Sequence, residues 1–212
     1  MVSFNLELDK KMQSLCDLSV IVVTYNSEVY IRECLLALDA ALKGLRFEKI
    51  IVDNRSSDQT KTIVKGAFAH WQLLELAKNR GYAAACNRGI AHSRGEYVVV
   101  INPDVIVEEE TLGQLVQCMR DHPHAGVVSG RLLNSDKTIQ KSCRVFPTPK
   151  LIFFRAIDNI FNFRGHSISS SYLMGDFAPN SAHPVDWLIG ALLCIRKKAL
   201  DDIGLFDEKF FL

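Results

Sequence analysis

The stretch Gly95–Glu110, GEYVVVINPDVIVEEE, decides the fold class of this chain. Its first half, Tyr97–Ile101, is an uninterrupted apolar and β-branched run, which is typical of a strand buried on both faces. The strand stops where Asn102-Pro103-Asp104 begins, because Pro103 cannot donate to a strand ladder. Asp104 then follows the carboxyl end of a central strand, where open α/β sheets bind their ligands. A carboxylate beside an amide suits a hard divalent cation, although Asn, Pro and Asp also favour a simple turn.

Upstream of this stretch, strands and helices alternate. Leu18–Thr24 is a second β-branched run typical of a buried parallel strand, and residues 49–52 and 71–76 are further strand candidates. Apolar residues recur at helical spacing over 31–42 and 56–67, which predicts a helix after each of the first two strands. This alternation predicts an α/β fold with a doubly wound, mostly parallel sheet.

Downstream, the same pattern continues and then changes. A helix of small residues is predicted over 82–93, a helix opened by Glu108–Glu110 follows, and residues 126–133 are a strand candidate. From residue 134 the composition is more polar. A hairpin turn is predicted at 134–137, with an antiparallel strand over 138–145.

The remaining segments complete an expected division of the chain. The aromatic-rich run 151–163 is either a helix packed on the domain or a flap that faces a membrane or an acceptor, and 165–183 is a predicted loop. Residues 185–195 return to core composition, and a short helix is predicted over 196–203. Three parts are therefore expected: a leader (1–17), an α/β part (18–133) and a smaller antiparallel and helical part (134–212).

Composition excludes several classes of function. A net charge of +1 over 212 residues argues against a nucleic-acid-binding protein. The six cysteines lack paired or zinc-like spacing and are expected to be reduced core residues. The amino terminus lacks an apolar signal core, and no apolar run approaches the ~20 residues that span a bilayer. We therefore expect a cytoplasmic protein, with peripheral association at the inner face of the plasma membrane left open.

Polar clusters follow three of the predicted strands. They are Thr24-Tyr25-Asn26, Asp53-Asn54 and Asn102-Pro103-Asp104. Alternating βα connections place all three at one edge of the sheet. Such a set suits a ligand with a base, a sugar and a diphosphate, because an acceptor group reads the base edge, an aromatic ring packs on the base and a metal neutralises phosphate. No glycine-rich phosphate loop follows the first strand, so Arg80 or another cation must assist the metal.

These residues resemble the inverting family-2 glycosyltransferases of the GT-A fold. The matching segments occur in the family's order and are LSVIVVTYN (18–26), IIVDNRSSDQT (50–60), NRGYAAACNRGI (79–90), GEYVVVINPDV (95–105) and VDWLIGALLCIRKKALDDIGLFDEKFF (185–211). The Asn-Pro-Asp form and the Trp-Leu-Ile-Gly-Ala segment look most like the rhamnosyltransferase-type subgroup that builds bacterial polysaccharides. The resemblance implies a UDP- or dTDP-linked sugar as donor, rhamnose in that subgroup, and a glycan or lipid-linked acceptor.

The resemblance also implies roles for single residues. Asp53 would hold the pyrimidine edge of the nucleotide, Arg80 would lie near the base or the diphosphate, and Asp104 would bind Mn²⁺ or Mg²⁺. Asn102 stands where the family has the first acid of its Asp-x-Asp. The other residues expected at the nucleotide are Thr24, Tyr25, Asn26, Asn79 and Asn102. The resemblance further implies that residues 18–133 bind the nucleotide sugar and that residues 134–212 form the acceptor side.

The mechanism that the resemblance implies is a single displacement at the anomeric carbon, in which a carboxylate takes the proton of the acceptor hydroxyl. In the family this base lies in a Glu-Asp segment shortly after the Phe-Asp-Glu-Lys-Phe-Phe match, and the sequence ends at Leu212 before such a segment. A C-terminal truncation with little or no transfer is therefore expected, and Asp186 is the candidate base within the chain. Trp187 beside it resembles the acceptor-side segment, or is a core residue.

The residues themselves also allow two alternative functions. A nucleotidyltransferase also uses a metal on an α/β sheet, but it usually has a glycine-rich basic loop after the first strand, where this chain has TYNSEVYIRE. A non-catalytic nucleotide-sugar-binding or assembly module would need only the donor half of the site.

Overall fold

The computed structural model describes residues 16–42, 44, 46–140, 142–144, 146, 149 and 182–211. The chain divides into two compact units, Met1–Ser129 together with Gly190–Leu212, and Gly130–Ile189. The predicted parts 18–133 and 134–212 do not coincide with these units, because residues 190–212 pack with the first one. The assignment of a nucleotide-binding and an acceptor-side part stays a prediction.

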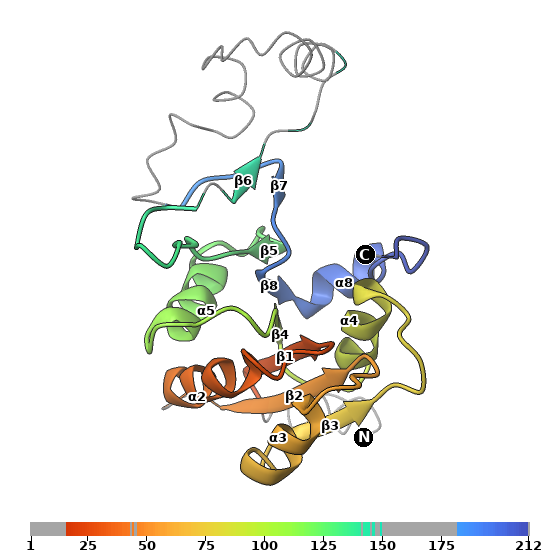
Figure 1. The fold of residues 1–212 in the computed structure, drawn as a ribbon. Helices are drawn as coiled ribbons and strands as arrows, with labels where there is room; N and C mark the ends of the chain where they lie inside the picture. The colour runs from red at the N-terminus through yellow and green to blue at the C-terminus, as the bar shows by residue number, and fades with distance from the viewer. Residues whose placement is uncertain are drawn as a thin grey trace, which may run out of the picture. The chain divides into compact units, whose positions relative to one another are not determined.

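The first unit is built on one six-stranded sheet in the order β3-β2-β1-β4-β8-β5 (Figure 1). The strands are β1 (Leu18–Thr24), β2 (Phe47–Asp53), β3 (Gln72–Glu75), β4 (Tyr97–Ile101), β5 (Val127–Val128) and β8 (Leu192–Arg196). Strands β3, β2, β1 and β4 are parallel, whereas β8 runs antiparallel to both β4 and β5. The predicted α/β class with a mostly parallel sheet is confirmed.

Helices cover both faces of this sheet (Figure 1). One face carries α2 (Ile31–Ala41), α3 (Thr60–Ala67) and α5 (Thr111–Asp121), and the other carries α4 (Tyr82–Ile90) and α8 (Lys197–Ile203). Helix α4 lies very close to the strands, since a Cβ at Gly89 would lie 2.5 Å from Ile21 Cγ2 and 3.2 Å from Val52 Cγ2. The small residues predicted for this helix are what permit that approach.

Two strands agree with the sequence prediction to the residue, and a third was predicted too long. β1 and β4 occupy the predicted ranges, and every residue in both is buried. The strand predicted at 126–133 is wrong beyond Val128. There the Ser129 hydroxyl donates to the carbonyl of Leu192 at 2.7 Å, and the chain leaves the sheet for the second unit at Gly130.

Two predicted helix starts are also wrong, in each case by a few residues. Helix α3 begins at Thr60 because residues 56–58 form a loop bonded to the segment after β1, for example through the N–H of Glu28, which donates to Asp58 Oδ2 at 3.0 Å. Helix α5 begins at Thr111, so the three glutamates 108–110 precede the helix and do not form its first turn.

The second unit contains the predicted turn but little of the predicted strand. Asn134 donates to the carbonyl of Thr138 at 2.8 Å and Lys137 to that of Asn134 at 2.9 Å, which confirms the turn at 134–137. After the turn, Ile139 forms an isolated antiparallel bridge with Leu133, and the N–H of Gln140 donates to the carbonyl of Leu132 at 2.9 Å. Among the described residues of 138–145, only β6 (Cys143–Arg144) forms a strand, antiparallel to β7 (Trp187–Leu188).

Three sequence predictions fall mainly or wholly outside the described residues. They concern the leader up to residue 15, the aromatic run 151–163 and the loop 165–183 up to residue 181. In the part of the chain that is described, no helix is long and apolar enough to cross a bilayer.

Candidate functional site

Strands β1, β2 and β4 end together at the carboxyl edge of the sheet. Thr24 lies opposite Asp53 in the parallel register, and the N–H of Asn54 donates to the carbonyl of Thr24 at 2.8 Å. On the other side of β1, strand β4 ends at Ile101 and is followed by Asn102. The three polar clusters therefore meet at one edge, as the alternation of strands and helices predicts.

Asp53 and Thr24 are buried at this edge with unused hydrogen-bonding capacity. Each residue is 1% exposed. Asp53 Oδ2 accepts the N–H of Ser56 at 2.9 Å, so this half of the carboxylate closes the turn after β2. Asp53 Oδ1 and Thr24 Oγ1 have no hydrogen-bond partner among the described residues. Because an unsatisfied buried polar atom costs about 1–3 kcal/mol, a ligand that bonds to either atom would be stabilised here.

Asn54 connects the end of β2 to the next part of the site. The sequence analysis named it in the cluster Asp53-Asn54 but gave it no role of its own. This side chain is 4% exposed. Its Nδ2 donates to Asn79 Oδ1 at 2.9 Å and to the carbonyl of Gly81 at 3.2 Å, and its Oδ1 accepts the N–H of Arg80 at 3.1 Å. Asn54 thereby ties the loop 79–81 to the end of β2. Its place directly after Asp53, at the end of a buried strand, is what put it in that predicted cluster.

A pocket with a volume of about 190 Å³ lies at the same edge. Its lining carries no charged side chain and consists of Val23, Tyr25, Ser27, Asn54, Asn79, Tyr82, Asn102 and Pro103. Tyr25, Asn79 and Asn102 were predicted at the nucleotide, and the structure brings them together here. The Tyr82 hydroxyl donates to the carbonyl of Gly190 at 2.9 Å, and burial raises its pKa strongly, so it stays protonated. Amide and hydroxyl groups of this kind suit a hydroxyl-rich, uncharged ligand.

Asn26 has a different role from the other residues predicted at the nucleotide. It adopts a left-handed conformation with φ of 48°, and its Oδ1 accepts the N–H of Ser57 at 2.8 Å. Its own N–H donates to the hydroxyl of Ser56 at 2.9 Å. Asn26 therefore fixes the loop that follows β2, which is the loop that closes on Asp53.

Asp104 is exposed beyond the end of β4. Among the described residues, no group of three or more His, Cys, Asp or Glu side chains could hold a metal ion. Burial, with the negative charge of Asp104 as a second cause, raises the pKa of Cys34 to about 12, so this nearby thiol is neutral at pH 7. Within the described part of the chain, a metal at Asp104 would therefore not find three such side chains, and water or a substrate would have to complete its coordination.

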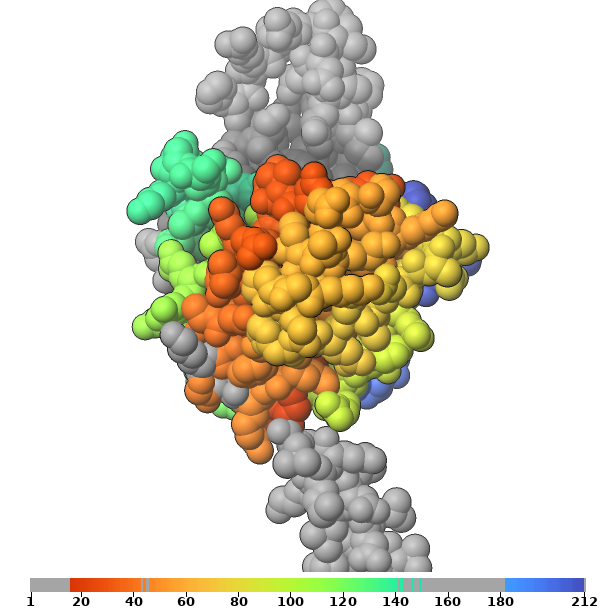
Figure 2. All heavy atoms as spheres, turned by 60° about the horizontal axis from the view of Figure 1, so that its bottom comes forward, coloured from red at the N-terminus to blue at the C-terminus, as the bar shows by residue number. Residues whose placement is uncertain are grey.

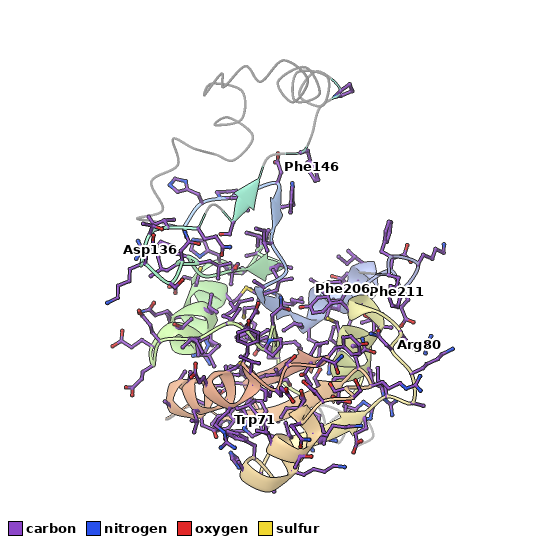
Figure 3. The ribbon with its side chains drawn as sticks, in the orientation of Figure 1. Trp71, Arg80, Asp136, Phe146, Phe206 and Phe211 are labelled. Carbon is purple, nitrogen blue, oxygen red and sulfur yellow. The ribbon has the colours of Figure 1, made fainter. Side chains whose placement is uncertain are left out.

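Arg80 and Asp186, the remaining predicted residues, lie in different units. The exposed guanidinium of Arg80 pairs with Glu208 at 3.1 Å, on the side of the first unit where Figure 3 labels Arg80, Phe206 and Phe211. Asp186 belongs to the second unit, where its Oδ2 accepts the N–H of Phe146 at 2.8 Å. Its action as a base stays a prediction.

The sheet, the polar edge and the sequence place this chain in a known family. Residues 19–181 match the family model described as Glycosyl transferase family 2. The chain belongs to glycosyl transferase family 2, which confirms the resemblance drawn from the sequence.

Individual relatives support the same assignment. The chain is 28% identical over 206 residues to the N-acetylglucosaminyl-diphospho-decaprenol L-rhamnosyltransferase of Mycobacterium tuberculosis, covering 92% of this chain and 66% of that protein. Two solved structures share the fold. One is S. aureus TarS 1-349 in complex with UDP-GlcNAc, with a TM-score of 0.56 and 24% identity, covering 90% of this chain and 48% of that one. The other is the mannosyltransferase PcManGT from Pyrobaculum calidifontis in complex with GDP-Man and Mn²⁺, with a TM-score of 0.57 and 22% identity, covering 97% and 55%. The chain thus spans about half to two thirds of the length of these proteins, and the expected GT-A fold is confirmed.

Proposed function

We propose that this chain is the donor-binding part of a glycosyltransferase, which moves a sugar from a nucleoside-diphosphate sugar to a glycan or lipid-linked acceptor. The observation that carries the proposal is the pair of buried, unpartnered atoms, Asp53 Oδ1 and Thr24 Oγ1, at the carboxyl edge of the sheet. Family membership and the rhamnosyltransferase relative support this reaction class, with rhamnose as the sugar transferred.

Asp53 reads the edge of the nucleotide base in this proposal. Its Oδ1 accepts the imide N–H of uracil or thymine, and the new hydrogen bond offsets the cost of a bare buried carboxylate oxygen. The Thr24 hydroxyl lies opposite in the register and donates to a carbonyl of the same base. Tyr25, which is 51% exposed at the pocket, packs on the face of the ring. A UDP- or dTDP-linked donor meets these requirements.

The diphosphate and sugar are assigned to the neighbouring groups. The uncharged pocket formed in part by Asn79, Tyr82 and Asn102 takes the sugar hydroxyls, and Arg80 faces the diphosphate. Asp104 and the amide of Asn102 would hold Mn²⁺ or Mg²⁺, whose chemistry is to neutralise the departing diphosphate. A site with few acidic ligands fits these ions, because both commonly complete their coordination with substrate phosphates and water.

The acceptor half of the reaction is also a proposal. An acceptor hydroxyl is a poor nucleophile until a positioned carboxylate removes its proton. Asp186 is the candidate base within the chain. The relative's decaprenol-linked substrate supports a lipid-linked acceptor, which would bring the protein to a membrane surface.

Calorimetry with UDP, TDP and GDP, with and without Mn²⁺, tests the donor-binding proposal. We expect UDP or TDP to bind more tightly than GDP, and each more tightly with Mn²⁺. Equal affinity for all three nucleotides would overturn base reading by Asp53, and no binding of any of them would overturn the donor-binding function. Release of free UDP or TDP from a sugar-linked donor distinguishes an enzyme from a non-catalytic binding module.

A further inference from the structure

The residues that follow α8 are bonded to α4. We refer to residues 206–211 as the tail segment. Asn87, which is 8% exposed in α4, makes three hydrogen bonds to it. Its Nδ2 donates to the carbonyl of Phe206 at 2.8 Å and to Glu208 Oε1 at 3.0 Å, and its Oδ1 accepts the N–H of Phe206 at 3.0 Å. The side chain of Asn87 thus uses both donors and its acceptor on the tail segment.

The tail segment also contacts the loop 79–81. Glu208 bonds Asn87 with one carboxylate oxygen and Arg80 with the other, the latter at 3.1 Å. Gly81 has φ of 85°, and a Cβ at this position would lie 3.0 Å from Cδ2 of Phe211. The blue C-terminal residues lie against the yellow residues around 80 on the surface in Figure 2, and the labelled Phe211 lies near Arg80 in Figure 3.

The loop 79–81 is therefore held from two directions. Asn54, at the end of β2, makes hydrogen bonds to all three residues of the loop. The tail segment holds the same loop through Glu208 and Phe211. Asn79 lines the pocket, so the conformation of the loop sets the shape of one pocket wall.

We infer that the tail segment positions the loop 79–81, which carries this wall and also Arg80, the residue assigned to the diphosphate, and that Asn87 and Glu208 are positioning residues for nucleotide binding. The inference rests on the proposed function, because the pocket is taken to hold a nucleotide sugar. If the loop already has its bound conformation, binding does not have to pay the free energy of ordering it, so the affinity is higher. Neither positioning residue lines the pocket, so both act through the loop 79–81.

The first test is Asn87→Asp in the full chain, which keeps the size of the side chain and the acceptor for the N–H of Phe206. It removes both donated hydrogen bonds and places a negative charge beside Glu208. We expect faster amide hydrogen exchange in residues 79–82 and 206–211, and UDP binding weakened by about 2- to 30-fold, the range for residues that act on a site without touching the ligand. Asp202→Asn, a carboxylate change at an exposed position of α8, is the matched control and should change neither quantity.

The second test combines Asn87→Asp with Glu208→Gln. An amide at position 208 can donate to the aspartate at position 87, so the double variant should recover part of both the UDP affinity and the exchange protection. Glu208→Gln alone keeps an acceptor oxygen for Asn87 and loses the ion pair with Arg80, so it should have the smaller effect. Its exposed position also keeps the inference testable if Asn87→Asp does not fold.

Two results would overturn the inference. One is faster exchange in the tail segment with unchanged exchange in residues 79–82 and unchanged UDP affinity. The other is equal loss of affinity in the double variant and in Asn87→Asp, since a specific contact predicts partial recovery. If the wild-type chain binds no UDP, the proposed function fails, and the exchange of residues 79–82 measured without nucleotide decides whether the tail segment holds the loop.

Discussion

Strand β2 carries one carboxylate near each end, and the two have opposite surroundings. Near the amino end, Glu48 accepts the hydroxyl of Ser19 at 2.5 Å, the N–H of Arg94, and the Nε–H of Arg94 at 3.1 Å. At the carboxyl end, Asp53 accepts one N–H from Ser56 and leaves Oδ1 buried without a partner among the described residues. Both carboxylate oxygens of Glu48 therefore accept hydrogen bonds within the protein. Only one of the two oxygens of Asp53 does so among the described residues.

This difference separates a structural carboxylate from one that is suited to a ligand. Burial alone would raise the pKa of Glu48, but the hydrogen bonds from Ser19 and Arg94 outweigh it and hold the pKa below its ordinary value. Those hydrogen bonds therefore stabilise the folded state. The bare oxygen of Asp53 is a cost to the folded state that a nucleotide can remove. The two residues should therefore respond differently to substitution, one in stability and the other in binding.

The largest effect on nucleotide affinity is expected for Asp53→Ala. Loss of the acceptor should weaken UDP binding by about 1–3 kcal/mol, or roughly 5- to 150-fold, measured by calorimetry. Asp136→Ala, a turn carboxylate of the second unit, is the matched control and should bind UDP like the wild type. If Asp53→Ala binds UDP as tightly as the control does, the unpartnered oxygen of Asp53 does not contribute to nucleotide binding.

Asp104→Asn should remove the effect of Mn²⁺ and leave the fold intact. The side chains are nearly the same size, but a neutral amide binds a hard cation more weakly than a carboxylate does. Without the negative charge of Asp104, the ratio of UDP affinities with and without Mn²⁺ should fall to about one. Calorimetry in Mn²⁺ and in EDTA measures the ratio, with circular dichroism to check the fold. An unchanged ratio would place the metal elsewhere and leave Asp104 as a turn residue.

Glu48→Gln should lower stability and leave nucleotide binding unchanged. The loss of charge-assisted hydrogen bonds should cost about 1 kcal/mol, which corresponds to a fall in Tm of about 2–4 °C for a chain of this size. Because the pKa of Glu48 is lowered on folding, its contribution is present above the unfolded value near 4.5 and is lost as the pH falls through the lower folded value. The acid side of the stability profile should therefore be less steep in the variant, as followed by thermal melts from pH 3 to about 6. A loss of UDP affinity without a change in Tm would reverse the roles assigned to the two carboxylates.

The smallest effect on nucleotide affinity is expected for Asp186→Asn. Asp186 bonds Phe146 in the second unit and does not line the pocket, so UDP should bind as it does to the wild type. Transfer to an added lipid-linked acceptor is the separate readout. If Asp186 is the base, transfer should fall by about 10²–10⁴-fold while donor binding is retained. A variant that still transfers at the wild-type rate would exclude Asp186 as the base.

Features that depend on neighbouring residues could be predicted from the sequence, whereas contacts between residues far apart in the sequence could not. The runs Leu18–Thr24 and Tyr97–Ile101 consist almost entirely of strand-forming residues, so their ranges could be predicted to the residue. Asp53 could be identified because it stands where a buried strand ends. The partners of Asn54 could not be, since it bonds a residue 25 positions away. The same holds for Asn87, whose partner Phe206 is 119 residues away and leaves no local pattern in the sequence.

The most direct test of base reading by Asp53 is calorimetry with UDP and with its N3-methyl derivative, on wild type and Asp53→Ala. Methylation removes the imide N–H that Oδ1 is proposed to accept. We predict that the wild type binds UDP about 5- to 150-fold more tightly than the methylated nucleotide, and that Asp53→Ala binds the two equally. Equal binding of both nucleotides by the wild type, or the same preference in both proteins, would contradict base reading by Asp53.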